Sequence, residues 1–243
     1  MLLTLPRWIA HRGGGALAPE NTLAGIRLAA RMGYRAVEFD VMLSGDGTPV
    51  LIHDETLERT TNGQGRVAET ADAELFRLDA GQGEPIPRLD EALALCRTLG
   101  LLANIEIKPS TGQDIDTADA VIAHCRDWPG TGLISSFSLP ALAQCRAQLP
   151  QLPRGVLFER LPSDWAQWVR ELGATTLHCA AAEAAGPRLP EIIAAGVPVV
   201  CYTVNAPETA EMLFGMGVSA CFTDALDTFV AETTAYKPLQ LMG

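Results

Sequence analysis

The sequence predicts a single (β/α)8 TIM barrel spanning residues 1–243, with a small insertion at about 55–88, after the third expected strand. Short apolar runs alternate with segments of helical periodicity, which is typical of parallel strands joined by helical crossovers. The length of 243 residues suits such a barrel, which commonly takes about 250 residues. Polar, reactive residues fall near the ends of the apolar runs, and in a barrel those ends converge on one mouth. A doubly wound open sheet is the alternative.

The expected elements follow from the apolar patterns and the turn residues. The first strand, Trp8–His11, ends at a Gly-rich turn, and a helix follows with Asn21 as its expected N-cap. Residues 44–49 are rich in turn formers and too few for a parallel crossover, so the second strand is expected to run into a hairpin. Residues 55–88 lack a clear period and are expected to form a rim or lid. The expected strands are 8–11, 37–41, 50–53, 103–108, 133–137, 154–158, 175–179, 197–204 and 220–223, and the later helices are about 89–99, 114–126, one capped by Ser138, 163–172, 188–195 and 206–214.

Composition limits the partners and the compartment. The net charge is −11 and the pI is about 4.8, and so acidic a chain without a basic run is a poor binder of nucleic acid. No apolar run approaches the roughly 20 residues that span a bilayer, so membrane insertion is not expected. The six cysteines are scattered in apolar surroundings without a C-x-x-C pair, which predicts buried thiols in a cytoplasmic protein. The sequence does not indicate an oligomeric state.

Two acidic residues on one strand indicate a metal site. Side chains alternate along a strand, so Glu38 and Asp40 share one face, about 6–7 Å apart along the chain. Glu106, near the end of a later strand, is expected to join them at the mouth. Three oxygen donors suit a hard divalent cation, Mg²⁺ or Ca²⁺, and Mn²⁺ is also compatible. Two structural explanations stay open: an edge strand with two solvated acids, and an internal salt bridge between Glu106 and Lys108.

Two histidines and two cations complete the expected site. Arg12 can grip phosphate oxygens in a bidentate manner, and Lys108 acts as a point charge. His11 and His53 can give and take protons near neutral pH. A metal, two cations and two imidazoles together favour a phosphodiester as the substrate. The alternative for His53 is a structural hydrogen-bonded pair with Asp54 at a turn.

These residues fall in motifs that, as an ordered set, resemble the glycerophosphodiester phosphodiesterases. The resemblance runs from about residue 8 to 228, and within the family it is greatest to the bacterial cytosolic branch linked to glycerol 3-phosphate uptake. The motifs are His11-Arg12-Gly13, Pro19-Glu20-Asn21-Thr22, Glu38-x-Asp40, His53-Asp54, Glu106-x-Lys108, Ser135-Ser136-Phe137, Tyr202-Thr203-Val204-Asn205 and Thr223-Asp224.

The resemblance implies a phospholipase C-like phosphodiesterase barrel that hydrolyses glycerophosphodiesters to sn-glycerol 3-phosphate and an alcohol. It also implies roles for the residues above: metal ligation by Glu38, Asp40 and Glu106, acid–base catalysis by His11 and His53, and phosphate binding by Arg12 and Lys108. Many family members have Trp where this chain has Tyr202 and Pro where it has Leu226. Both positions belong to the substrate rim, so Tyr202 is an expected substrate contact and the alcohol preference stays open.

Two other functions remain compatible with the sequence. A phosphodiesterase on the same scaffold could act on lysophospholipids or sphingomyelin, although no apolar landing surface for an acyl chain is evident. An inactive barrel could instead bind a metal or a phosphate; the loss of His11, His53 or a metal ligand would favour it, and all are present. In the leading interpretation the leaving alcohol points toward the rim formed by residues 55–88.

Overall fold

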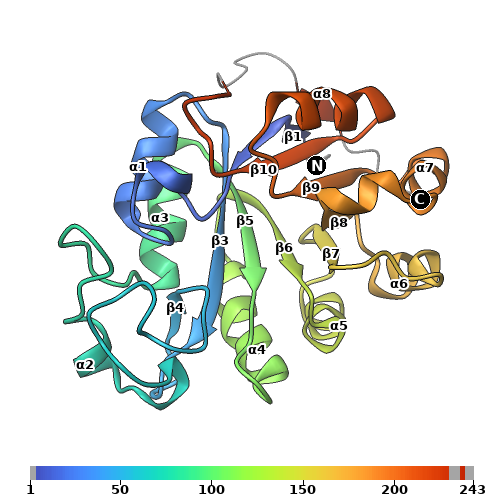
Figure 1. The fold of residues 1–243 in the computed structure, drawn as a ribbon. Helices are drawn as coiled ribbons and strands as arrows, with labels where there is room; N and C mark the ends of the chain where they lie inside the picture. The colour runs from blue at the N-terminus through green and yellow to red at the C-terminus, as the bar shows by residue number, and fades with distance from the viewer. Residues whose placement is uncertain (1–3, 230–235, 239–243) are drawn as a thin grey trace.

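A nine-stranded sheet that closes on itself forms the centre of the protein (Figure 1). The structure is a computed structural model that describes residues 4–229 and 236–238. Eight strands are parallel, and β2 closes the barrel by pairing with both β3 and β10. The barrel strands are β2 (Trp8–Ala10), β3 (Ala36–Leu43), β5 (Leu102–Ile107), β6 (Thr131–Ser136), β7 (Arg154–Phe158), β8 (Thr176–Ala180), β9 (Val199–Tyr202) and β10 (Ala220–Thr223).

Helices follow most of the barrel strands and cover the outside of the sheet (Figure 1). They are α1 (Leu23–Arg31), α3 (Leu89–Leu99), α4 (Asp114–Cys125), α5 (Leu139–Gln148), α6 (Trp165–Leu172), α7 (Arg188–Ala194) and α8 (Pro207–Met216). Within the described residues, the short 3-10 turn η1 (Gly15–Leu17) precedes α1, and two more, η2 (Val67–Glu69) and η3 (Ala181–Ala185), follow it along the chain. The predicted (β/α)8 barrel is confirmed, and the open-sheet alternative is wrong because β2 pairs with β3.

The predicted hairpin is also present. Strand β4 (Pro49–Leu51) pairs antiparallel with β3 and is the ninth member of the sheet. A separate two-stranded ribbon joins β1 (Thr4–Pro6) to β11 (Tyr236–Pro238). The expected N-cap of α1 is wrong by one residue: Thr22 caps the helix, and its hydroxyl accepts a hydrogen bond from the Gly25 N–H at 3.2 Å.

The two faces of β3 and β5 separate the core from the site. Val37, Phe39 and Val41 alternate along β3 and belong to the large hydrophobic cluster shared with the surrounding helices. Glu38 and Asp40 occupy the opposite face, which looks into the barrel. A smaller apolar cluster that contains Ile9, Leu102, Leu133 and Val200 also lies among the barrel strands. The alternation therefore carries the acidic residues inward without interrupting the outer core.

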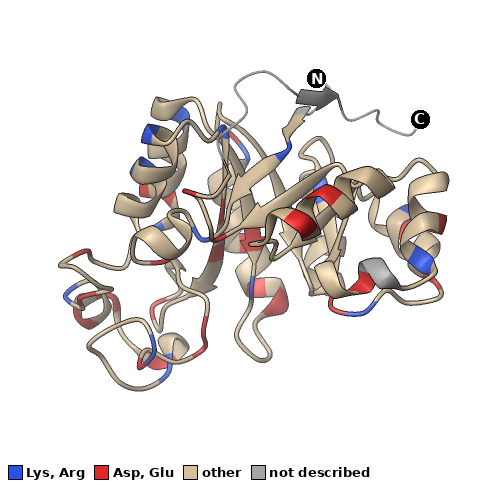
Figure 2. Ribbon diagram, turned by 45° about the horizontal axis from the view of Figure 1, so that its top comes forward, with Lys and Arg blue, Asp and Glu red and all other residues tan. Residues whose placement is uncertain are grey.

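Residues 52–88 form a compact unit beside the β3–β4 hairpin. The unit contains η2 and the short helix α2 (Asp72–Leu75). It packs against the hairpin through a hydrophobic cluster to which β3 contributes Met42 and β4 contributes Val50. The other buried members are Ile52, Leu57, Val67, Leu75, Ala80 and Ile86. Basic and acidic residues both occur along the backbone of this unit (Figure 2). No helix in the described part of the chain combines the length and apolarity needed to cross a bilayer.

Candidate active site

Three carboxylates from two adjacent strands meet at the mouth of the barrel. Glu38 and Asp40 lie on β3, and Glu106 lies on β5 opposite Asp40 in the parallel register. Their exposed fractions are 2%, 2% and 9%, and each offers a ligand oxygen within 4.8 Å of the others. The expected common face is therefore confirmed, and burial shows that the solvated edge-strand explanation is wrong.

The carboxylate cluster is unfavourable without a counter-charge. Burial raises the pKa of Glu38 well above its usual value, and the charges of Asp40 and Glu106 raise it further. Burial and then the charge of Asp40 raise the pKa of Glu106 to about 8, against the opposing effect of two nearby cations. The Oε1 atom of Glu38 is buried without a hydrogen-bond partner. An unpartnered oxygen among three buried carboxylates fits a hard divalent cation, which takes oxygen ligands and offsets their repulsion.

His11 follows β2 and is held by a carboxylate from the far end of the chain. Its Nδ1 lies 2.7 Å from Oδ1 of Asp224, the residue after β10. Asn205 fixes Asp224 in turn, because its Oδ1 accepts a hydrogen bond from the Asp224 backbone N–H at 2.8 Å. Burial raises the pKa of Asp224, but the hydrogen bond and charge of His11 outweigh it, so the net direction is downward. The second ring nitrogen, Nε2, lies 3.9 Å from Oε2 of Glu38 and so faces the carboxylates.

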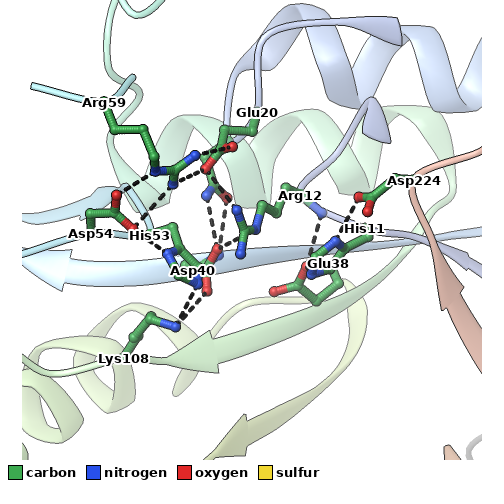
Figure 3. Close-up of polar contacts among 11 residues, drawn as sticks. His11, Arg12, Glu20, Glu38, Asp40, His53, Asp54, Arg59, Lys108 and Asp224 are labelled. Carbon is green, nitrogen blue, oxygen red and sulfur yellow. Dashed lines mark hydrogen bonds and ion pairs between the residues drawn. The ribbon is translucent and has the colours of Figure 1, made fainter. Parts of the chain in front are cut away.

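His53 is held on both ring nitrogens (Figure 3). Its Nδ1 lies 2.5 Å from Oδ1 of Asp54, and Nζ of Lys108 lies 2.7 Å from its Nε2. An ammonium group can only donate, so Nε2 accepts and the neutral ring carries its proton on Nδ1. Burial lowers the pKa of His53, and the Lys108 charge adds to this effect against the nearby carboxylates. Arg59 closes the network by bridging Asp54 and Glu20 (Figure 3).

The two expected phosphate-binding cations also contact the acidic cluster. Arg12 has a φ of 48°, uncommon for a residue other than glycine, and its backbone N–H donates to Oε2 of Glu38 at 2.9 Å. Its guanidinium lies 3.6 Å from Asp40 and donates to Glu20 at 3.0 Å. Lys108 Nζ lies 3.9 Å from Oδ1 of Asp40. The alternative salt bridge from Lys108 to Glu106 is not among the ion pairs of the residues that the structure describes.

Asn21 has a role that its sequence position did not indicate. Its Nδ2 donates to Oδ2 of Asp40 at 2.9 Å, and its Oδ1 accepts the Asp40 backbone N–H at 3.0 Å. Its φ of 57° turns the chain so that the side chain reaches β3. Asn21 therefore orients a carboxylate of the cluster.

These groups surround a cavity of about 430 Å³. Its lining combines the expected charged residues and Tyr202 with five residues that were not expected in the site: Phe137, Leu157, Glu159, Thr203 and Phe222. None of the lining residues comes from 55–88. The lining residues are His11, Arg12, Glu38, Asp40, His53, Glu106, Lys108, Phe137, Leu157, Glu159, Tyr202, Thr203 and Phe222.

Part of the unassigned lining was detectable from strand position. Phe137 directly follows β6 and Glu159 directly follows β7, the same placement that points to His11 after β2. Leu157 and Phe222 are apolar strand residues, so nothing distinguishes them in the sequence from core residues. Only closure of the barrel brings them to the cavity.

Other polar residues of the barrel strands lie outside the cavity lining. His178 is completely buried, hydrogen-bonds Thr176 at 2.9 Å, and has its pKa lowered to about 3 by burial. Ser135 and Ser136 are also buried, and each makes a hydrogen bond within the barrel wall. Their hydrogen bonds go to neighbouring residues of the barrel wall, and Nδ1 of His178 is buried without a hydrogen-bond partner.

A closed (β/α)8 barrel with a polar cavity at the carboxyl ends of its strands has the architecture of TIM-barrel enzymes. The model of the glycerophosphoryl diester phosphodiesterase family matches residues 11–228. The chain belongs to this family and is a glycerophosphodiester phosphodiesterase by class, as the motifs predicted.

Relatives support the assignment along most of the chain. A phosphodiesterase of Oleispira antarctica, solved in complex with the product sn-glycerol 3-phosphate, shares 38% identity with a TM-score of 0.89, covering 92% of this chain and 95% of that one. A glycerophosphodiester phosphodiesterase of Caldanaerobacter subterraneus subsp. tengcongensis is 33% identical over 236 residues, which is 91% of this chain and 95% of the relative. The solved glycerophosphodiester phosphodiesterase of Agrobacterium tumefaciens strain C58 shares 28% identity with a TM-score of 0.72, covering 94% of this chain and all of that one.

Proposed function

We propose that the protein hydrolyses glycerophosphodiesters to sn-glycerol 3-phosphate and an alcohol, in a metal-dependent reaction that uses His11 and His53. The observation that carries the proposal is the joint placement of three buried carboxylates, two carboxylate-held imidazoles and two cations around one cavity. The product bound to the Oleispira antarctica relative supports the same substrate class.

The binding roles follow from charge. Glu38, Asp40 and Glu106 would hold the divalent cation, and the chemistry it supplies when bound is stabilisation of negative charge on the phosphoryl oxygens. Mg²⁺ and Ca²⁺ suit the all-oxygen donor set, and Mn²⁺ is compatible with it. Arg12 and Lys108, which both lie beside Asp40, would bind and orient the phosphate.

The contacts of the two histidines favour different proton-transfer roles. His53 is neutral and presents Nε2 as an acceptor, so it suits the general base once a phosphate draws Lys108 away. His11 is oriented by the contact of its Nδ1 with Asp224 and turns Nε2 toward the carboxylates, so it suits the acid that protonates the departing alkoxide. Tyr202, at the edge of the cavity, would contact the substrate.

The compartment and partners follow from the same features. All six cysteines are free and buried, which supports a reducing, cytoplasmic location. The partner is a small-molecule substrate that enters the barrel mouth.

The decisive experiment follows both products of glycerophosphocholine cleavage. Purified protein, stripped by a chelator and then resupplied with Mg²⁺, Ca²⁺ or Mn²⁺, is assayed for free choline and for sn-glycerol 3-phosphate. We expect equimolar products with the cation and loss of both without it. In the same assay His11→Ala and His53→Ala should lose activity, and His124→Ala is their matched control, because His124 is exposed on α4.

Four results would contradict the proposal. Undiminished activity after exhaustive chelation would refute metal dependence. Release of phosphocholine in place of choline would refute the position of the cleaved bond. A preference for lysophosphatidylcholine over glycerophosphocholine would favour the lysophospholipase D-like alternative, and no turnover with any cation would favour the inactive barrel.

A further inference from the structure

One wall of the cavity takes no part in the chemistry proposed above. Phe137 directly follows β6, Glu159 directly follows β7, and Tyr202 ends β9, and all three line the cavity. The metal-binding carboxylates come from β3 and β5 instead. We call Phe137, Glu159 and Tyr202 the aromatic wall.

The two rings of the aromatic wall form a fixed pair. Their centroids are 5.9 Å apart, and their planes meet at 81° in a T-shaped contact. The Tyr202 hydroxyl donates to the Phe158 carbonyl at 3.0 Å, which holds the ring in place and uses its one donor. Phe137 is 42% exposed, high for a large apolar side chain. The wall therefore presents π surface to a ligand rather than hydrogen-bond donors.

Glu159 places a negatively charged carboxylate near these rings. It is exposed, and within the described part of the chain no hydrogen bond or ion pair engages its carboxylate. Burial raises the pKa of Tyr202, and the charge of Glu159 is among the further causes, which places that charge near the ring. The cavity cations lie elsewhere, with Arg12 on Glu20 and Lys108 on His53. The carboxylate of Glu159 is therefore available to a cationic ligand.

We propose that the aromatic wall is a subsite for a cationic leaving alcohol, with a quaternary ammonium such as that of choline as its best ligand. Aromatic faces attract a cation that lies within about 6 Å, and a quaternary ammonium gives up its water more easily than an ammonium. The Glu159 carboxylate complements the same charge. A neutral alcohol such as glycerol gains neither contact. The inference rests on the proposed function for the position of the phosphate.

This subsite differs from the position expected from the sequence. Residues 55–88 were expected to meet the leaving alcohol, but none of them lines the cavity. The aromatic wall therefore replaces that segment as the surface that selects among alcohols.

The test compares two substrates that share the glycerol phosphate and differ in the charge of the alcohol. Values of kcat/KM are measured for glycerophosphocholine and glycerophosphoglycerol with wild type, Phe137→Leu, Glu159→Gln and Glu159→Lys. We expect the choline-to-glycerol ratio to fall about threefold to tenfold in the first two variants and further in Glu159→Lys. Glu171→Gln, an exposed acid at the end of α6, is the control and should keep the wild-type ratio.

A binding measurement separates this inference from the proposed reaction. Calorimetric titration of His53→Ala with both diesters reports affinity without turnover, and Glu159→Lys in that background should weaken glycerophosphocholine selectively. If wild type hydrolyses neither diester but the binding preference persists, the proposed function fails and the subsite stands. Equal losses for both diesters, or no change of the ratio in any variant, would overturn the subsite.

Discussion

Removal of the divalent cation should make the stability of the protein fall as the pH rises from 6.5 to 8.0. In the metal-depleted protein, Glu106 has a pKa of about 8, against an ordinary value of 4.5. Between these values the folded state holds a proton that the unfolded chain has released, so the free energy of unfolding decreases with rising pH. The raised pKa of Glu38 acts in the same direction. The lowered pKa values of His53 and His178 act in the opposite direction, but mainly below pH 6.5.

The size of the effect follows from the same pKa. A carboxyl with a folded pKa of about 8 loses on the order of 1–2 kcal/mol of its contribution between pH 6.5 and 8.0, since one pKa unit corresponds to about 1.36 kcal/mol. For a chain of this length that is roughly 2–8 °C in Tm. A free cation concentration of 100 times the Kd stabilises the folded protein by about 2.7 kcal/mol. Binding requires ionised carboxylates, so this stabilisation should grow as the pH rises.

The measurement is the Tm by calorimetry, taken at pH 6.5 and 8.0 for metal-depleted protein and for protein saturated with Mg²⁺ or Ca²⁺. Glu106→Gln keeps the shape of the side chain without its titration, so it should lose most of the pH dependence and most of the cation shift. The exposed Glu171→Gln variant should retain both. A Tm of the metal-depleted wild type that is flat or rising over this range, or a cation shift equal at both pH values, would refute the electrostatic reasoning.

Three further outcomes concern catalysis and are measured by steady-state kinetics. His11→Ala and His53→Ala should each lower kcat by about 10²–10⁴. The kcat of the double variant should be well above the value expected if the two losses multiplied, because both residues serve one proton-transfer sequence. Near wild-type turnover in the double variant would exclude both roles. Asp224→Asn should lower kcat about 10- to 100-fold with little change in KM, since a hydrogen bond to a charged group is worth about 1.5–3 kcal/mol; a change confined to KM would mean that Asp224 does not position His11. Arg59→Met should lower kcat by less than about tenfold, because Arg59 is 46% exposed and acts on His53 only through Asp54; a pH profile of kcat identical to wild type would separate Arg59 from His53.

Strand alternation made much of the site accessible from the sequence. Alternation is a local property of the backbone, so the spacing of Glu38 and Asp40 determined that both share one face and that Phe39 joins the core. The position of Glu106 at the end of a later strand predicted its place at the same mouth. The turn-rich residues 44–49 likewise determined the β3–β4 hairpin, because so short a connection cannot make a parallel crossover.

The expected cap of α1 failed for a reason that lies in tertiary contacts. Asn and Thr are both good N-cap residues, so local preference does not decide between Asn21 and Thr22. The paired hydrogen bonds of Asn21 to Asp40 decide it, because they use both ends of the Asn21 amide. Those bonds exist only after β3 has been placed beside the loop that follows β2.

What the sequence determined by itself was the barrel, its inward acidic face and the family to which the chain belongs, since each is written in local pattern and ordered motifs. Tertiary structure alone decided which groups hold one another. The bond of His11 to Asp224 joins residues that are 213 positions apart, and Arg59 reaches Glu20 across 39. The same holds for the aromatic wall, whose members lie at the ends of separate strands. Such contacts depend on closure of the barrel, and nothing in the spacing of those residues along the chain encodes them.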